Sequence, residues 1–196
     1  INAVLLRPLP YQAPGRLVVV EHFYPSLNNM EAPVSVPGFH DYQAQGQVFQ
    51  SAAVETGWAP NLTGQGEPER IAGLRVTGDY FRTYGVPAAL GRTPAPDSAG
   101  AADDHVLVLS HGAWQRLFGG DPGAIGRSVL LDGERYEIIG VMPATFRGFR
   151  FRAAQFWTPL RFRPDQFSDN LRTNEFLTFT GRLKDGVTVA QAQAEL

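Results

Sequence analysis

Residues 103–142 read DDHVLVLSHGAWQRLFGGDPGAIGRSVLLDGERYEIIGVM, and this stretch decides the fold. The apolar run at 106–109 has the length and composition of a buried strand. Ser110 follows in the position of a helix N-cap, and apolar and aromatic residues recur at helical spacing over 111–118. A Gly-Gly pair at 119–120 predicts the end of this helix, because glycine readily adopts the left-handed conformation that terminates helices.

The second half of the stretch predicts a β-hairpin. Asp132-Gly133 is a strong signal for a two-residue type I′ turn, and it separates alternating segments at 128–131 and 134–141. Both faces of the longer segment are partly apolar, so we expect the hairpin to be covered on both sides. The stretch contains no cluster of chemically reactive side chains, which makes it informative about architecture rather than catalysis.

The rest of the chain also mixes expected strands with short expected helices. Pro159 marks one expected strand as an edge strand, because proline cannot donate to an interior ladder. The expected strands cover 17–23, 49–55, 71–76, 155–160 and 175–183, with a turn at 61–66. The expected helices are a segment capped by Ser35 and ending near Gly46, a segment at 78–84 capped by Thr77 and stopped by Gly85, and a final helix opened by a Thr188/Gln191 capping box.

Composition limits the class of protein. The 196 residues are 43% hydrophobic and 11% aromatic, which fits one globular domain or two small ones. The chain has no cysteine, so disulfides, cysteine-ligated zinc and thiol catalysis are excluded. No cofactor is expected. The glycine-rich pieces match no nucleotide-binding motif, so any use of ATP lies in another polypeptide or domain.

Charge and hydropathy narrow the choice of partners. The net charge is −2, so no overall basic field attracts nucleic acid, although residues 147–196 carry eight basic against five acidic side chains. No window approaches the ~20 apolar residues of a membrane span. The opening INAVLLRPLPY is interrupted by Arg7, Pro8 and Pro10, and we interpret it as the exit end of a membrane helix lying upstream.

Five phrases carry a resemblance to a known family. In order they are AVLLRPLPY, PVSVPGFHDYQAQ, RVTGDYFRTYGVPAALGRT, the run from VLVLS through WQRLFGGDPGAIGRSVLLDG to YEIIGVMP, and RLKDGVTVAQAQAEL. Together they cover nearly the whole chain. The sequence resembles the MacB-like periplasmic core domain of ABC-transporter permeases of the MacB/FtsX type, and is most similar to the acidobacterial-type branch.

The resemblance implies a two-part α+β domain in a membrane machine. A porter-like βαβ subdomain is expected at 1–86 and 174–196, with a mixed α/β, Sabre-like subdomain inserted at 87–173. Such domains lie in the periplasm between the first two membrane helices of an inner-membrane permease. They are non-catalytic, and they transmit ATP-driven motion from an ABC nucleotide-binding ATPase to export or extraction of a substrate, or to a partner protein. A periplasmic adaptor and a second permease copy are further candidate partners; nucleic acid is not.

Reactive side chains do not form a convincing catalytic or metal site. None of the four histidines, His22, His40, His105 and His111, has the spacing of a zinc motif. His40-Asp41 could orient a base, but Ser110 lacks a nucleophile elbow and its N-cap role explains it fully. An enzyme is therefore the least favoured interpretation.

One surface loop is the best candidate contact site. Arg147, Phe149, Arg150, Phe151 and Arg152 interleave cations with aromatic rings, a pattern suited to a partner protein or to anionic lipid headgroups. The simpler interpretation is a loop whose phenylalanines pack inward while its arginines face water. A different function also remains open, namely a soluble periplasmic module that binds a small molecule between its two parts, with Trp58, Trp114 or Trp157 stacking on the ligand.

Overall fold

The computed structural model describes residues 11–27, 29–45, 47–95, 104–148, 151 and 153–196. The strands are β1 (Leu17–Val20), β2 (His22–Tyr24), β3 (Asn29–Ala32), β4 (Phe49–Trp58), β5 (Asn61–Thr63), β6 (Glu69–Arg70), β7 (Gly73–Val76), β8 (Leu90–Gly91), β9 (Val106–Leu109), β10 (Ser128–Leu131), β11 (Glu134–Val141), β12 (Phe156–Pro159) and β13 (Thr178–Leu183). The helices are α1 (Val36–Gln45), α2 (Tyr80–Tyr84), α3 (His111–Phe118) and α4 (Val189–Glu195). Short 3-10 turns are η1 (Pro14–Arg16), η2 (Pro25–Leu27), η4 (Pro122–Ala124), η5 (Pro164–Phe167) and η6 (Asp169–Leu171).

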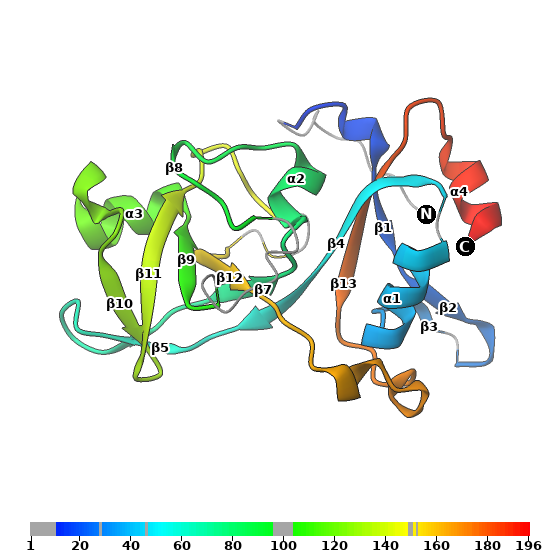
Figure 1. Cartoon of the computed structure of the whole chain (residues 1–196), viewed down its shortest axis with the longest axis horizontal. Helices are drawn as coiled ribbons and strands as arrows, with labels where there is room; N and C mark the ends of the chain where they lie inside the picture. The colour runs from blue at the N-terminus through cyan, green and yellow to red at the C-terminus, as the bar shows by residue number, and fades with distance from the viewer. Residues whose placement is uncertain (1–10, 28, 46, 96–103, 149–150, 152) are drawn as a thin grey trace.

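Two lobes lie side by side along the long axis of the molecule (Figure 1). The first lobe holds β1, β13, the hairpin β2–β3, α1 and α4, and the second holds β5 to β12 with α2 and α3. One mixed sheet runs through both lobes in the order β1-β13-β4-β7-β12-β9-β11-β10-β5-β6, and β8 pairs with β11. The mixture of a large sheet with short helices confirms the expected α+β class.

Strand β4 belongs to both lobes. Its residues from Phe49 to Glu55 pair with β13, and its residues from Glu55 to Trp58 pair with β7. After Pro60 the chain continues in the same direction as strand β5, which pairs with β10. The second lobe is therefore a ring of β4–β5, β7, β12, β9, β11 and β10, in which the chain itself joins β4 to β5.

The stretch at 103–142 folds as predicted. The Ser110 hydroxyl accepts a hydrogen bond from the Ala113 backbone N–H at 3.1 Å, and Gly119 ends α3 in the left-handed conformation, with φ of 61°. Asp132 and Gly133 both have positive φ, 51° and 85°, as a type I′ turn requires. Strand β11 is buried on both faces over its second half, which confirms that this part of the hairpin is covered on both sides.

We expect Ser110→Ala to lower the free energy of unfolding by about 1 kcal/mol, because one helix N–H loses its acceptor. Ser110→Asp is the matched control, since aspartate caps helices equally well and should retain most of the stability. Urea unfolding followed by circular dichroism measures both. Equal stability of Ser110→Ala and the parent chain would show that the cap contributes nothing.

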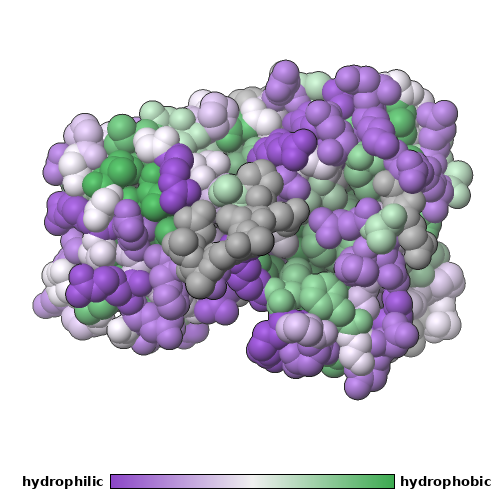
Figure 2. Space-filling view, in the orientation of Figure 1, coloured by the Kyte–Doolittle hydropathy of each residue, from purple (hydrophilic) through white to green (hydrophobic). Residues whose placement is uncertain are grey.

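Apolar side chains fill both lobes and the space between them. Val34, Phe39 and Phe179 belong to the core of the first lobe, and Leu109 and Ile138 to that of the second. A third cluster crosses the junction and includes Tyr11, Ala53, Tyr80, Phe146 and Trp157. Figure 2 shows hydrophilic residues over much of the facing surface, with a smaller hydrophobic patch on the second lobe. The lobes are thus joined by packed core as well as by β4.

Three local predictions are corrected by tertiary contacts. Strand β12 is interior, between β7 and β9, and Pro159 is tolerated because it is the last residue of the strand. Residues 61–63 are strand rather than turn, since Leu62 is buried and β5 pairs with β6 and β10. The Thr77 hydroxyl does not cap α2; it accepts the backbone N–H of Val54 at 3.1 Å and so ties the start of α2 to β4.

The division into subdomains at residues 87 and 174 stays a prediction. Strand β7 and helix α2 precede residue 87, and they lie in the second lobe beside β12. The first lobe contains β1, β13, α1 and α4, which all fall in the expected porter-like segments.

Candidate functional site

The arginine and phenylalanine loop lies at the junction of the lobes. Arg147 and Phe151 are exposed, Phe151 by 41%, whereas Gly148 between them is buried. The Tyr11 hydroxyl donates a hydrogen bond to the Arg147 carbonyl oxygen and lies 3.3 Å from the Arg147 backbone nitrogen. Phe149, Arg150 and Arg152 lie outside the described residues. The contact role of this loop stays a prediction, although the exposure of Phe151 does not fit a ring that packs inward.

A buried polar pair lies beneath this loop. Glu55 is the residue of β4 that pairs on both sides, with Thr178 in the first lobe and Val76 in the second. Its side chain is buried, and so is that of Tyr80 at the start of α2. A Cβ atom at Gly148 would lie 2.9 Å from the Tyr80 hydroxyl and 3.9 Å from Glu55 Oε2, so the loop packs directly on both groups.

Burial raises the pKa of Tyr80 well above its usual 10.0, and the neighbouring Tyr84 and Glu55 add to the rise. The folded state therefore holds the phenol proton more tightly than the unfolded chain does. This contribution to stability is complete below pH 10.0 and is lost as the pH rises from there toward the folded pKa.

We expect the free energy of unfolding to fall above about pH 10, and to fall less steeply in Tyr80→Phe, which has no proton to lose at this position. Urea unfolding of both chains between about pH 8 and about pH 11 measures the two slopes. The readout is the difference between the slopes, so a constant change in stability from the lost hydroxyl does not affect it. Identical slopes would contradict a raised pKa at Tyr80.

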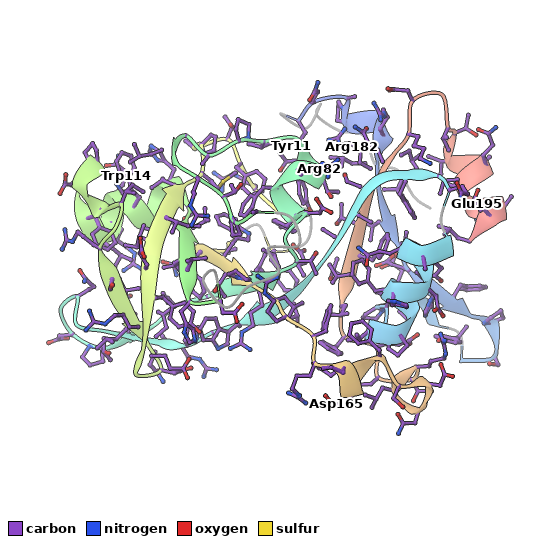
Figure 3. All side chains as sticks on the ribbon, in the orientation of Figure 1. Tyr11, Arg82, Trp114, Asp165, Arg182 and Glu195 are labelled. Carbon is purple, nitrogen blue, oxygen red and sulfur yellow. The ribbon has the colours of Figure 1, made fainter. Side chains whose placement is uncertain are left out.

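A cavity of about 540 Å³ opens between the lobes near the same junction. We call it the junction cavity; it is lined by Arg16 from η1, Arg82 from α2 and Arg182 from β13. Figure 3 shows Arg82 and Arg182 close to one another between the two lobes. Arg16 is held by an ion pair with the exposed Asp185 and by a hydrogen bond to the Leu183 carbonyl at 2.8 Å.

Arg182 is the unusual residue of the junction cavity, because it is a buried cation. Its side chain reaches under α2, where Nε donates to the Thr83 carbonyl at 2.7 Å and Nη1 donates to the Gln12 carbonyl at 2.8 Å. The residue is 6% exposed. Burial lowers the pKa of Arg182, and the nearby charge of Arg16 lowers it further.

A second cavity of about 370 Å³ lies in the first lobe and is lined by a polar network. His22 Nδ1 contacts Glu175 Oε1, and His22 Nε2 lies 2.9 Å from the Tyr42 hydroxyl. The Tyr24 hydroxyl donates to the same Glu175 oxygen at 2.6 Å, and this bond raises the pKa of Tyr24. Arg172 and Asp41 form an ion pair of 2.6 Å at the rim.

This network ties β2, α1 and the segment before β13 together. A histidine beside a carboxylate can hold or move a proton. The residues that line the cavity include Ser35, but its hydroxyl accepts the Gly38 backbone N–H at 3.2 Å, in the capping role expected for it. The network therefore fits a structural connection better than nucleophilic catalysis. Sequence reasoning did not find Glu175, which is 153 positions from His22 and belongs to no motif.

The remaining histidines each have a different neighbour. His40 lies 3.8 Å from Asp41, His105 lies 3.3 Å from Glu134, and His111 meets the Trp114 ring edge-on. Within the described residues there is no group of three histidine, cysteine, aspartate or glutamate side chains that could hold a metal ion.

The three tryptophans line neither cavity. Trp157 is buried in the core at the junction, so the ligand-stacking role considered for it is wrong. Trp58 packs against Tyr136 and Phe156, and the Nε1–H of Trp114 donates to the Asp121 carbonyl at 2.8 Å. Their sequence positions could not show this, because stacking on a ligand and packing in a core need the same residue type.

Over the described ranges, none of the helices has both the length and the apolar character needed to cross a bilayer. The longest of them, α1, has ten residues.

Comparisons with known proteins agree with the architecture. The model of the family "MacB-like periplasmic core domain" matches residues 8–196. The macrolide export ATP-binding/permease protein MacB of Chromobacterium violaceum is 27% identical over 136 residues, which is 69% of this chain and 20% of that protein. The chain thus spans about a fifth of the length of this relative.

Solved structures show the same fold. The periplasmic region of MacB from Actinobacillus actinomycetemcomitans superposes with a TM-score of 0.63 at 14% identity, covering 91% of this chain and 78% of that one. A domain of a protein described as a permease from Porphyromonas gingivalis gives 0.68 at 15% identity, with 97% and 81% covered. The extracellular domain of the ABC-type transporter YknZ from Gram-positive bacteria gives 0.60 at 15% identity, with 91% and 86% covered. Since the family model covers almost the entire sequence, this chain belongs to the family of MacB-like periplasmic core domains.

Proposed function

We propose that the chain is the periplasmic domain of a MacB/FtsX-type ABC-transporter permease of the bacterial inner membrane. In this role it is non-catalytic, and it transmits ATP-driven conformational change to export or extraction of a substrate, or to a partner protein. Membership of the family and the shared fold of the MacB and YknZ domains support this proposal.

The observation that carries the proposal is the sharing of β4 by both lobes. A strand that pairs with β13 at one end and with β7 at the other transfers displacement of one lobe directly to the other. Separating the lobes would break these backbone hydrogen bonds and expose the buried junction cluster, including Tyr80 and Trp157. The domain is therefore suited to move as a lever rather than as two loosely tethered halves.

The proposal includes the partners and the internal division. An ABC nucleotide-binding ATPase drives the permease through its membrane part, and a periplasmic adaptor or a second permease copy receives the motion. The loop with Arg147, Phe149, Arg150, Phe151 and Arg152 is the proposed contact with such a partner or with lipid headgroups. The lever comprises the porter-like segments 1–86 and 174–196 and the Sabre-like segment 87–173.

Distance measurements in the full-length permease with its ATPase, reconstituted in a bilayer, test the proposal. The chain has no cysteine, so Arg135→Cys in β11 and Gln193→Cys in α4 place one probe on the exposed surface of each lobe. We expect the distance from the Arg135 probe to acceptor-labelled lipids to change when ATP is added. The distance between the two probes should stay constant, because β4 couples the lobes.

ADP is the nucleotide control. A probe-to-membrane distance that is the same with ATP, with ADP and without nucleotide would contradict transmission. A change confined to the distance between the two probes would show that the lobes move independently, which contradicts the lever.

The second candidate function is a soluble periplasmic module that binds a small molecule. The junction cavity favours it, because about 540 Å³ lies within the size range of small-molecule sites. In the same experiment, this alternative predicts no response of the probes to nucleotide.

A further inference from the structure

The junction cavity contains a buried guanidinium that has no carboxylate partner among the residues that the structure describes. Arg182 is 6% exposed, and the two hydrogen bonds of its guanidinium go to neutral backbone carbonyls. Its Nη2 atom is buried without a hydrogen-bond partner in the structure. A buried cation is costly unless it is paired with opposite charge, so this position is electrostatically incomplete.

The rest of the cavity adds positive charge. Arg16 and Arg82 also line it, and Asp185, the carboxylate in its lining, is 92% exposed and paired with Arg16. Arg82 lies 3.4 Å from Asp79 and its side chain is 61% exposed, so it can turn toward an incoming ligand. Among the described residues, three guanidinium groups from three elements therefore face a space with one lining carboxylate.

Gly85 and the Gln12 side chain line the cavity beside Arg182 Nη2. A Cβ at Gly85 would lie 3.3 Å from Nη2 and 3.4 Å from the Gln12 Cβ, so both groups surround the same point. Gly85 has φ of 68° as the stop of α2, and it carries no side chain to block that point. Gln12 is exposed, so a small shift of its side chain opens Nη2 to the cavity.

We propose that the junction cavity binds the phosphate group of a small phosphate ester, with Arg182 at its base and Arg82 and Arg16 at its sides. Guanidinium forks match the oxygens of phosphate, and a phosphate has enough oxygens to accept from more than one arginine. The volume exceeds that of a bare phosphate, and Phe81, Val86 and Pro87 provide an apolar wall for an organic group. The proposal stands on these contacts and does not depend on the lever function.

Titration of the 196-residue chain with inorganic phosphate and with glycerol phosphate tests the proposal. At 21.4 kDa, the chain is small enough for NMR of the arginine Nε–Hε groups. We expect a saturable shift of the Arg182 Nε–Hε signal with both probes, and tighter binding of the ester. Raising the salt concentration should weaken binding, as for any charge-driven contact.

Matched arginine variants locate the site. Arg182→Gln should weaken glycerol phosphate binding by about tenfold or more, and Arg82→Gln by about threefold because its charge is more exposed. Arg163→Gln, which removes an exposed arginine that is paired with Asp165 and does not line the cavity, should leave binding unchanged. If Arg182→Gln does not fold, the Arg182 signal of the parent chain and the comparison of Arg82→Gln with Arg163→Gln still decide the question.

A phosphate ester can reach the cavity as a free solute or as a lipid headgroup. Vesicles of phosphatidylglycerol and phosphatidylcholine, added to the parent chain and to Arg82→Gln, distinguish the two sources. Binding of glycerol phosphate without binding of vesicles identifies a soluble ligand, whereas binding of vesicles that is lost in Arg82→Gln identifies a headgroup. No shift of the Arg182 signal with phosphate or glycerol phosphate, or equal effects of Arg82→Gln and Arg163→Gln, would overturn the proposal.

Discussion

Trp157→Ala is expected to lower the free energy of unfolding by about 3–5 kcal/mol, the range for removing a large aromatic side chain from a core. Trp157 lies at the centre of β12, is 2% exposed, and packs against the rings of Phe81 and Phe146 at centroid distances of 5.9 and 5.2 Å. These rings come from α2 and from the segment after β11, and both are themselves buried in the same cluster. Chemical denaturation with a tyrosine or circular dichroism signal measures the loss.

Trp157→Phe is the informative companion. The indole Nε1 is buried without a hydrogen-bond partner in the structure, which is itself costly. Phenylalanine removes that unsatisfied donor and leaves a smaller void than alanine does, so the two effects oppose each other. We expect a net loss of less than about 1.5 kcal/mol. A loss in Trp157→Phe as large as that in Trp157→Ala would show that the indole nitrogen has a stabilising partner.

Gly73→Ala is expected to lower the free energy of unfolding by about 3 kcal/mol, at the upper end of the range for overpacking. A Cβ at Gly73 would lie 2.2 Å from Cζ of Phe156 and 2.4 Å from two further ring atoms. Phe156 is fully buried in the core of the second lobe, so the ring has no free space to enter. Gly73 is also the residue at which β7 meets the end of β4, opposite Trp58.

A compensating substitution tests the cause of this loss. Phe156→Leu alone should be destabilising because it leaves a void, but together with Gly73→Ala it provides room for the new methyl group. The double variant should therefore be more stable than the sum of the two single changes predicts. Strict additivity would mean that contact with the Phe156 ring is not the reason for the glycine. Gly112→Ala is the control, since nothing lies within 4 Å of a Cβ at this helical position.

Trp157→Ala and Gly73→Ala both affect the part of the second lobe that contacts β4. Trp157 and Gly73 support the ring of strands on the side where β4 enters it. Under the proposed function, variants that loosen this region should weaken coupling between the lobes before they abolish folding. The two-probe distance in the permease would then become broader in these variants than in the parent domain.

Interactions between residues close in the sequence were enough to predict many of the helices and turns. The cap at Ser110, the stop at Gly119 and the turn at Asp132-Gly133 depend on residues within about five positions of one another, so short-range patterns report them reliably. The capping box of Thr188 and Gln191 belongs to the same group. The five phrases that resemble the MacB-like family also indicated the fold class, because together they cover nearly the whole chain.

Long-range contacts decided the rest. Pro159 predicts an edge strand by itself, and only the pairing of β12 with β7 and β9 places it inside the sheet. The segment at 61–63 is too short to be recognised as a strand until its partner β10 is in place. The Thr77 hydroxyl could accept a backbone N–H from the following helix or from another element. The position of β4 makes the Val54 N–H its donor.

The sequence by itself determined the class, the local elements and the family, because capping, turns and apolar periodicity act between near neighbours. Only the tertiary structure brought His22 to Glu175 and placed Arg182 under Gln12, 170 positions away. It also placed Glu55 where the two lobes meet, beneath Gly148 and beside Tyr80. Burial and charge pairing at such sites arise from strands that meet across the sheet, and no pattern of neighbouring residues encodes which strands meet.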